Sequence, residues 1–156
     1  MPKYRLLTLQ ELAELEKEFI EYLVLNGITA DDWEKIKANK PSHADLIIEL
    51  FSDVIFESIL RKVKFLESHS PKEIRTFQCL DEKIICVGLS APDHSPYDLT
   101  NADFISRATK NPPEDLHIFL KEKSYSQSRE TELFQMIQNG CSISDGKLFK
   151  ALSLAL

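Results

Sequence analysis

The chain has 156 residues, of which 43% are hydrophobic and 28% are charged, with only 4 glycines. This length and composition predict one folded domain and exclude a disordered protein. Residues 1–66 carry 9 basic and 12 acidic groups, and residues 67–156 carry 10 and 13, so each half has a net charge of −3. Because neither half is basic, we expect no binding to nucleic acid.

The N-terminal residues Met1–Leu7 contain no apolar run of signal-peptide length, and no stretch approaches the roughly 20 apolar residues that span a bilayer. We therefore expect a cytoplasmic protein with no membrane partner. The three cysteines, Cys79, Cys86 and Cys141, lack C-x-x-C spacing. That pattern is typical of reduced, buried thiols rather than of a disulfide framework.

A helix-start pattern recurs along the chain, in which an apolar residue and a Ser or Thr precede an acidic residue three positions later. Such a hydroxyl caps the first turn and stabilises it by about 1 kcal/mol. The first two starts predict an amphipathic helix over 9–26, which ends at Asn26-Gly27, and a shorter helix to about Ala38. The starts are Thr8, Thr29, Thr100 and, more weakly, Ser42.

The longest predicted helix covers residues 42–66. Its apolar residues occupy more of the helix surface than one packing face requires, which is typical of a helix buried on several sides or covered by a partner. We expect a central core helix with Leu50, Phe51 and Val54 inside the core. A subunit interface that includes Phe56 is the alternative.

A β-hairpin is predicted over residues 72–90, because two β-rich runs flank Asp81-Glu82. If Leu80 faces Lys83, Cys79 pairs with Ile84, and Cys86 lies on that same face of the hairpin with Phe77. The turn lacks Asn-Gly or Asp-Gly, so this register could slip by one residue. Residues 3–7 offer a third strand.

The C-terminal part, residues 100–156, is predicted to be helical. A capped turn over 101–108 and a helix over 128–139 are expected, together with a helix whose Leu116, Phe119 and Leu120 share a face and a last helix that begins at Ile143-Ser144. The predicted fold is therefore α+β: a mostly helical single domain over 1–156. Its N-terminal half, 8–66, is helical, and its one β-hairpin packs against the long helix.

Three segments, Thr29–Lys35, Glu49–Glu57 and Asn139–Phe149, resemble a family of small soluble bacterial proteins of unknown function. The resemblance extends over nearly the whole chain. Since these segments are helix caps and helix faces, the resemblance implies no catalytic or binding residues.

Residues of catalytic type gather only in the polar loop around His94. There His94 could act as a base or a metal ligand, with Asp93 or Asp98 orienting its ring. The alternative is a solvated turn, because Asp, Ser and Pro are ordinary turn residues. His69 is the other weak metal candidate, but no H-x-x-x-H or paired C-x-x-C spacing exists, so no metal or cofactor is predicted.

The favoured function is a non-enzymatic protein-interaction domain, either a homodimer or a binder of an unidentified protein. The long helix and the C-terminal segment 151–156 carry more apolar residues than a small monomer easily covers. Interface candidates are therefore Phe56, Leu154 and Leu156. The alternative is an enzyme or a metal-dependent small-molecule binder that uses the loop 93–103.

Overall fold

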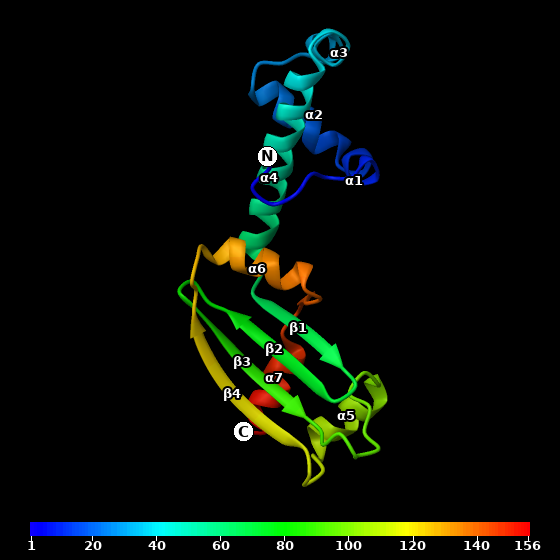
Figure 1. The fold of residues 1–156 in the computed structure, drawn as a ribbon, viewed down its shortest axis with the longest axis vertical. Coiled ribbons are helices and arrows are strands. Elements are labelled where there is room, and N and C mark those ends of the chain that lie inside the picture. The colour runs from blue at the N-terminus through cyan, green and yellow to red at the C-terminus, as the bar shows by residue number, and fades with distance from the viewer. The chain divides into compact units, whose positions relative to one another are not determined.

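The computed structural model describes all residues from 1 to 156, and the chain divides into two compact units. The helical unit is Met1–Arg61, and the sheet unit is Lys62–Leu156 (Figure 1). A single domain was predicted from the sequence, and cooperative unfolding of the two units is the property that would test it. None of the helices combines the length and apolar character needed to cross a membrane.

The helical unit contains four helices. Capping boxes begin α1 and α3 at the predicted hydroxyls, Thr8 with Glu11 and Thr29 with Asp32. Gly27, whose φ is 74°, follows the second helix at the predicted stop. The predicted first helix is interrupted at its middle, so that two helices replace one. The helices are α1 (Leu9–Glu14), α2 (Glu16–Leu25), α3 (Ala30–Asn39) and α4 (Pro41–Lys62).

The core of the helical unit is an aromatic cluster around Phe51, which is almost fully buried. Its ring centroid lies 4.9 Å from that of Phe19 and 5.3 Å from that of Tyr22. Phe19 in turn meets Trp33 edge-on at 5.2 Å. These tilted contacts join α2, α3 and α4, because aromatic pairs favour tilted or edge-to-face packing.

Residues 3–7 do not form the predicted third strand. The backbone N–H groups of Lys3 and Tyr4 donate to the carboxylate of Asp53, and that of Leu7 donates to Ser52 Oγ at 3.1 Å. Side chains of α4 thus satisfy backbone donors that a sheet would otherwise pair.

The prediction that Leu50 and Val54 lie in the core is wrong, although Phe51 is buried as predicted. Leu50 is 49% exposed and Val54 is 50% exposed. Together with Leu46 they lie four residues apart along α4 and so share one helix face. No other helix of the unit covers that face, whereas α2 covers the face that holds Phe51.

The sheet unit is built on five antiparallel strands in the order β4-β3-β2-β1-β5. The predicted hairpin is the pair β2 and β3, and its register is the one in which Cys79 pairs with Ile84 and Phe77 with Cys86. The predictions of one hairpin and of a mostly helical domain therefore understate the sheet, and the fold is mixed α+β. The strands are β1 (Phe65–Ser70), β2 (Glu73–Cys79), β3 (Lys83–Ser90), β4 (His117–Ser124) and β5 (Ser142–Ser144).

Strands replace three predicted helical segments. One of these strands is β5, which occupies the predicted start of the last helix, so that α7 (Lys147–Leu154) begins four residues later than Ile143. The long helix ends at Lys62 rather than Leu66, because Phe65 and Leu66 pair with both β2 and β5. The predicted helix with Phe119 and Leu120 on one face is β4, which pairs along the whole of β3. Short apolar runs fit both helix and strand periods, and here the available neighbouring strand decides between them.

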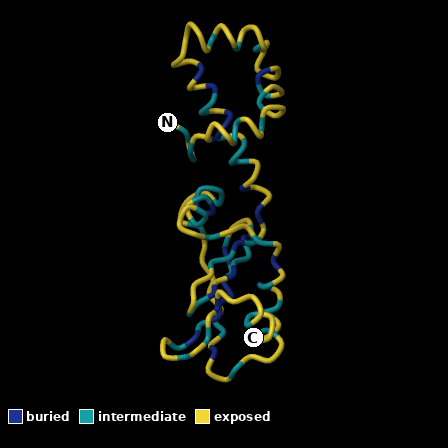
Figure 2. Tube along the Cα trace, turned by 90° about the vertical axis from the view of Figure 1, so that its right-hand side faces the viewer, coloured by how far each residue is buried: buried dark blue, intermediate teal, exposed yellow.

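Two helices cover one face of the sheet, α5 (Ala102–Lys110) and α7 (Lys147–Leu154). The core lies on this face, where dark-blue buried segments gather in Figure 2. Its main members are Ile74, Val87, Leu89, Leu99, Phe149 and Leu152.

The opposite face of the sheet is covered in part by α6 (Arg129–Gln138), the helix predicted over 128–139, whose N-cap is Ser128. Arg129 fastens the start of this helix to the end of the hairpin. Its guanidinium donates to the carbonyl oxygens of Leu80 and Cys79, each at 3.1 Å. The uncovered remainder of this face is open to solvent.

Candidate functional site

The polar loop favoured from the sequence is a turn held by its own hydrogen bonds. Lys72 donates from Nζ to the carbonyl oxygens of Ser95 at 2.8 Å and Tyr97 at 2.7 Å. Hydrogen bonds from the side chain and backbone of Thr100 hold the pKa of Asp98 below its usual value. These bonds order the loop, and none of them joins Asp98 to His94.

The remaining sequence-predicted site residues do not converge. Asp93 and His94 are exposed, and His94 makes no hydrogen bond or ion pair. His69 lies on β1, where its Nε2 is 2.8 Å from Oε1 of Glu67. The structure holds no group of three or more His, Cys, Asp or Glu side chains that could bind a metal ion.

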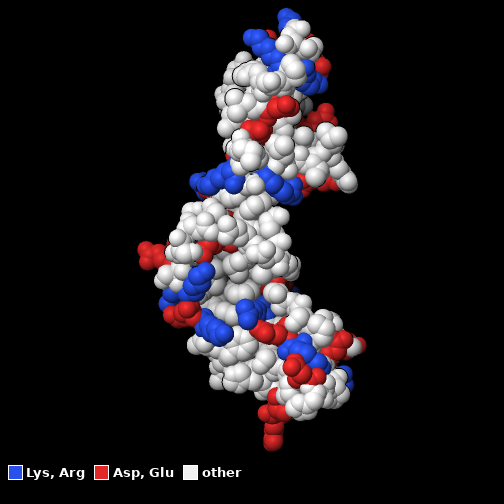
Figure 3. All heavy atoms as spheres, viewed as in Figure 1, with Lys and Arg blue, Asp and Glu red and all other residues white.

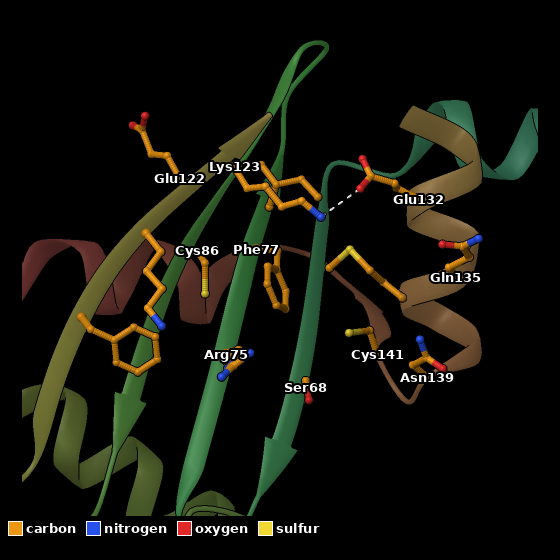
Figure 4. A pocket seen from close by; sticks show the side chains of 14 residues that line it. Ser68, Arg75, Phe77, Cys86, Glu122, Lys123, Glu132, Gln135, Asn139 and Cys141 are labelled. Atoms are coloured by element: carbon orange, nitrogen blue, oxygen red, sulfur yellow. Dashed lines mark hydrogen bonds and ion pairs between the residues drawn. The ribbon is translucent and has the colours of Figure 1, made fainter. Parts of the chain in front are cut away.

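A pocket of about 440 Å³, the sheet pocket, opens where α6 overhangs the sheet (Figure 4). Phe77 of β2, Cys86 of β3 and Phe119 of β4 line it from the sheet, and Met136 of α6 lines it from the other side. Ligand sites commonly measure about 300–1,000 Å³ and combine apolar walls with a few polar groups. The sheet pocket has this size and this kind of lining.

The Phe119 ring reaches its place because the strand beside it carries a glycine. Gly88 pairs with Phe119, and a Cβ on Gly88 would lie only 2.0 Å from Cζ of the ring. A glycine inside a strand often marks such a close approach. Gly88 therefore allows the ring to lie against β3 and form part of the pocket lining.

The charges of the sheet pocket are unevenly paired. Lys123 Nζ lies 3.0 Å from Oε1 of Glu132, the contact drawn as a dashed line in Figure 4. Burial alone would raise the pKa of Glu132, but hydrogen bonds from Lys123 and Ser126 outweigh it and lower the pKa. Lys121 has no carboxylate partner, and its Nζ lies 5.3 Å from the Phe119 ring centroid. Basic side chains accordingly gather beside apolar atoms on this face (Figure 3).

Two thiols line the sheet pocket, one on the floor and one at its edge. Cys86 is buried and Cys141 is half-buried, and burial raises the pKa of both. Cys141 directly precedes β5, which lies three strands from β3, so strand spacing separates the two by about 14 Å. That separation is too large for a disulfide, and both thiols are protonated at neutral pH.

A second concavity, the helical groove, lies between α1, α2 and α3 and has a volume of about 640 Å³. Leu9, which is 87% exposed, and Val24, which is 64% exposed, line it together with Ile20. Phe19 and Trp33 line it as well, so aromatic and aliphatic surfaces meet there. Figure 2 shows long exposed stretches along these helices. The groove is therefore an apolar surface that the unit leaves uncovered.

Acidic side chains border the helical groove. Glu16 and Asp31 line it without an ion pair, whereas Glu34 is neutralised by Lys37 at 3.0 Å. The helical unit carries 12 acidic and 7 basic residues, a net charge of −5, and the sheet unit carries 13 and 12, a net charge of −1. Most of the protein's net negative charge, −5 of −6, thus lies on the unit that exposes the apolar groove.

The three interface candidates from the sequence differ in exposure. Phe56 is half-buried, because the Arg5 guanidinium lies 4.7 Å from its ring centroid and Tyr4 packs beside it. Leu154 is 89% exposed, and Leu156 is also exposed. The two C-terminal leucines are therefore the ones available to a partner.

Sequence reasoning found only part of the sheet pocket. It placed Phe77 and Cys86 on one face of the hairpin, but it missed the strand that supplies the aromatic and basic wall. The signal was the alternation within β4, where Phe119, Lys121 and Lys123 occupy every second position and so share a face.

Comparison with known protein families assigns the whole chain to one family. A family model described as a family of unknown function, DUF6495, matches residues 1–156. The chain belongs to this family. The resemblance to a family of unknown function, expected from the helix caps and helix faces, is thereby confirmed. No curated protein matches the chain, and no solved structure matches it.

Proposed function

We propose that this DUF6495 protein is a non-enzymatic interaction module whose helical groove binds a basic amphipathic helix of another protein. The observation that carries the proposal is the coincidence of exposed apolar lining and unpaired acidic residues in one groove. Monomeric proteins rarely expose large contiguous apolar surfaces, and such surfaces commonly mark interaction sites.

The charge of the groove favours a basic partner over an acidic or neutral one. Glu16 and Asp31 make no ion pair, and the whole unit has a net charge of −5. A partner that brings Lys or Arg beside its apolar face would gain attraction at both long and short range.

The dimensions of the groove suit a helix. Its wall α2 has 10 residues, which corresponds to a length of about 15 Å, or roughly three helical turns. Helix-in-groove recognition uses apolar anchors at helical spacing along such a length. Leu9, Ile20 and Val24 would contact those anchors.

The fluorescence of Trp33 can report peptide binding, because Trp33 is the only Trp of the chain and it lines the groove. A Trp-free peptide of about 15 Leu and Lys residues, with Leu at helical spacing, is titrated into the full-length protein while Trp33 emission is followed. We expect a saturable shift with a dissociation constant of about 1–100 μM, weakened by added salt. The same peptide with Glu in place of Lys should cause no shift.

Two neighbouring substitutions on α2 test the location. Val24→Ser, inside the groove, should weaken the peptide about tenfold, a loss of about 1.4 kcal/mol. Leu25→Ser is the matched control, because Leu25 is also apolar and exposed but lies outside the groove. Equal binding of the Lys and Glu peptides, or equal effects of the two substitutions, would contradict the proposal.

Self-association is a second candidate, favoured by the exposed Leu154 and Leu156 at the end of α7. Sedimentation velocity at micromolar concentration should then show a dimer that Leu154→Ser dissociates. A monomer at every concentration would remove the homodimer and leave the groove proposal unaffected.

A further inference from the structure

The sheet pocket is separate from the helical groove and has its own chemistry. Phe77 and Phe119 come from β2 and β4, the strands on either side of β3, and these two strands lie about 10 Å apart. From β3, Ile84 and the small side chain of Cys86 line the pocket, while Gly88 lies beneath the Phe119 ring. The small Cys86 side chain beside the Phe77 ring leaves a recess in the sheet surface, and Met136 of α6 lines the same pocket from the other side.

The charged residues of the recess sum to a positive charge. Arg75, Lys121 and Lys123 line it against Glu122 and Glu132. Lys123 is engaged by Glu132, which itself is buried and fully hydrogen-bonded by Lys123 and Ser126. The carboxylate that pairs with Arg75 is that of Glu73, at the outer end of β2.

Lys121 differs from the other cations because no carboxylate lies within ion-pair distance of it. Its ammonium rests over the Phe119 ring instead, at 5.3 Å from the centroid. A cation held over an aromatic face at the edge of an apolar recess can accept an anion without first breaking an ion pair.

We infer that the sheet pocket binds a small aromatic carboxylate, with its ring on the recess between Phe77 and Phe119 and its carboxylate at Lys121. Aromatic rings pack favourably on phenylalanine rings and on a methionine thioether, which together supply the walls. The unpaired ammonium selects an anion over a cation of the same shape. The residues and the ligand differ from those of the helical groove, so either proposal can fail without the other.

The two methionines of the chain give a direct test. Met136 lines the sheet pocket, whereas Met1 is the fully exposed N-terminal residue. Protein labelled with ¹³C at the methionine methyl groups is titrated with 2-naphthylacetate and, separately, with 2-naphthylmethylammonium. We expect the carboxylate to shift the Met136 signal saturably and to leave the Met1 signal in place, while the ammonium compound causes a much smaller shift.

Charge reversal tests the role of Lys121. Lys121→Glu should weaken naphthylacetate at least tenfold and bring the two compounds to similar affinity. Lys150→Glu, on α7 at the opposite face of the sheet, makes the same change in net charge and should leave binding as in the wild type. Both lysines are exposed, so neither change should unfold the protein, and circular dichroism checks this.

Three results would overturn the inference. The Met136 signal could stay fixed at millimolar naphthylacetate, the ammonium compound could bind as well as the carboxylate, or Lys121→Glu could bind like the wild type. Each can be read on folded protein, and the first two require no substitution.

Discussion

At the scale of single residues, Glu11 links the N-terminal segment of the helical unit to α1. Its carboxylate accepts from Arg5 Nη1 at 2.8 Å and from the backbone N–H of Thr8 at 2.8 Å. These bonds, with that from Arg5 the stronger influence, lower the pKa of Glu11 to about 2. One carboxylate thus completes the capping box of α1 and fastens the preceding segment to it.

The depressed pKa predicts how acid affects this contact. A carboxyl group whose pKa is lower in the folded than in the unfolded state stabilises the fold above its unfolded pKa of 4.5, and the contribution is lost as pH falls toward 2. An NMR titration of the Glu11 side chain should give a midpoint near 2 in the wild type and a higher midpoint in Arg5→Met.

Asp32 is the internal control for that titration. Hydrogen bonds from Thr29, not from Arg5, lower its pKa. Its midpoint should therefore be the same in both proteins, and a Glu11 midpoint that ignores Arg5→Met would contradict the assignment.

At the scale of elements, the contact between β3 and β4 rests on a glycine–aromatic pair. Phe119 lies against Gly88 on the pocket face, while Val87 and Leu89 on the same strand point to the core. An antiparallel sheet can pack one face on the core and leave the other face in contact with water. Here the Phe119 ring covers part of the open face at Gly88.

Gly88→Ala should destabilise the sheet unit by about 1–3 kcal/mol, because the new methyl group would overlap the Phe119 ring. Urea unfolding followed by circular dichroism measures the loss. In a Phe119→Ala background the same substitution should cost less, since the overlapping ring is gone. An equal cost in both backgrounds would mean that backbone effects, not the ring, make Gly88 necessary.

At the scale of the whole molecule, the two units differ in how well they are packed. The helical unit is the shorter one and exposes several large apolar side chains, among them Leu9, Val24 and Leu50. The sheet unit buries Leu66, Ile74 and Leu133 almost completely. Small units that bury little apolar surface are marginally stable, so we expect the helical unit to unfold first.

Urea unfolding with two reporters tests this difference. Trp33 emission reports on the helical unit, and the Met136 methyl signal reports on the sheet unit. With slopes of about 1–2 kcal/mol per molar urea, a difference of about 1 kcal/mol would place the Trp33 midpoint roughly 0.5–1 M lower. Coincident transitions would instead mean that the chain unfolds as the single domain predicted from its sequence.

The sequence by itself determined the features that depend on hydrogen bonds between near neighbours. Thr8 and Thr29 cap the helices that their spacing predicts, and Gly27 ends α2. A capping hydrogen bond joins two residues that are three positions apart, so a short stretch of sequence is enough to predict it. The hairpin register was open to a slip of one residue on the sequence alone, and the structure has the register in which Leu80 and Lys83 close the turn.

Only the tertiary structure decided which apolar runs became strands and which faces stayed open. The backbone N–H and C=O groups of the segment 117–124 could be hydrogen-bonded in a helix or in a strand. The segment forms a strand because it pairs with the edge of β3. The exposure of Leu50 likewise depends on which helices lie beside α4. The sheet pocket and the helical groove arise from side chains on several elements, and no local pattern specifies such convergence. Capping hydrogen bonds join residues that are close together in the sequence, whereas strand pairing and burial depend on residues far apart in the chain.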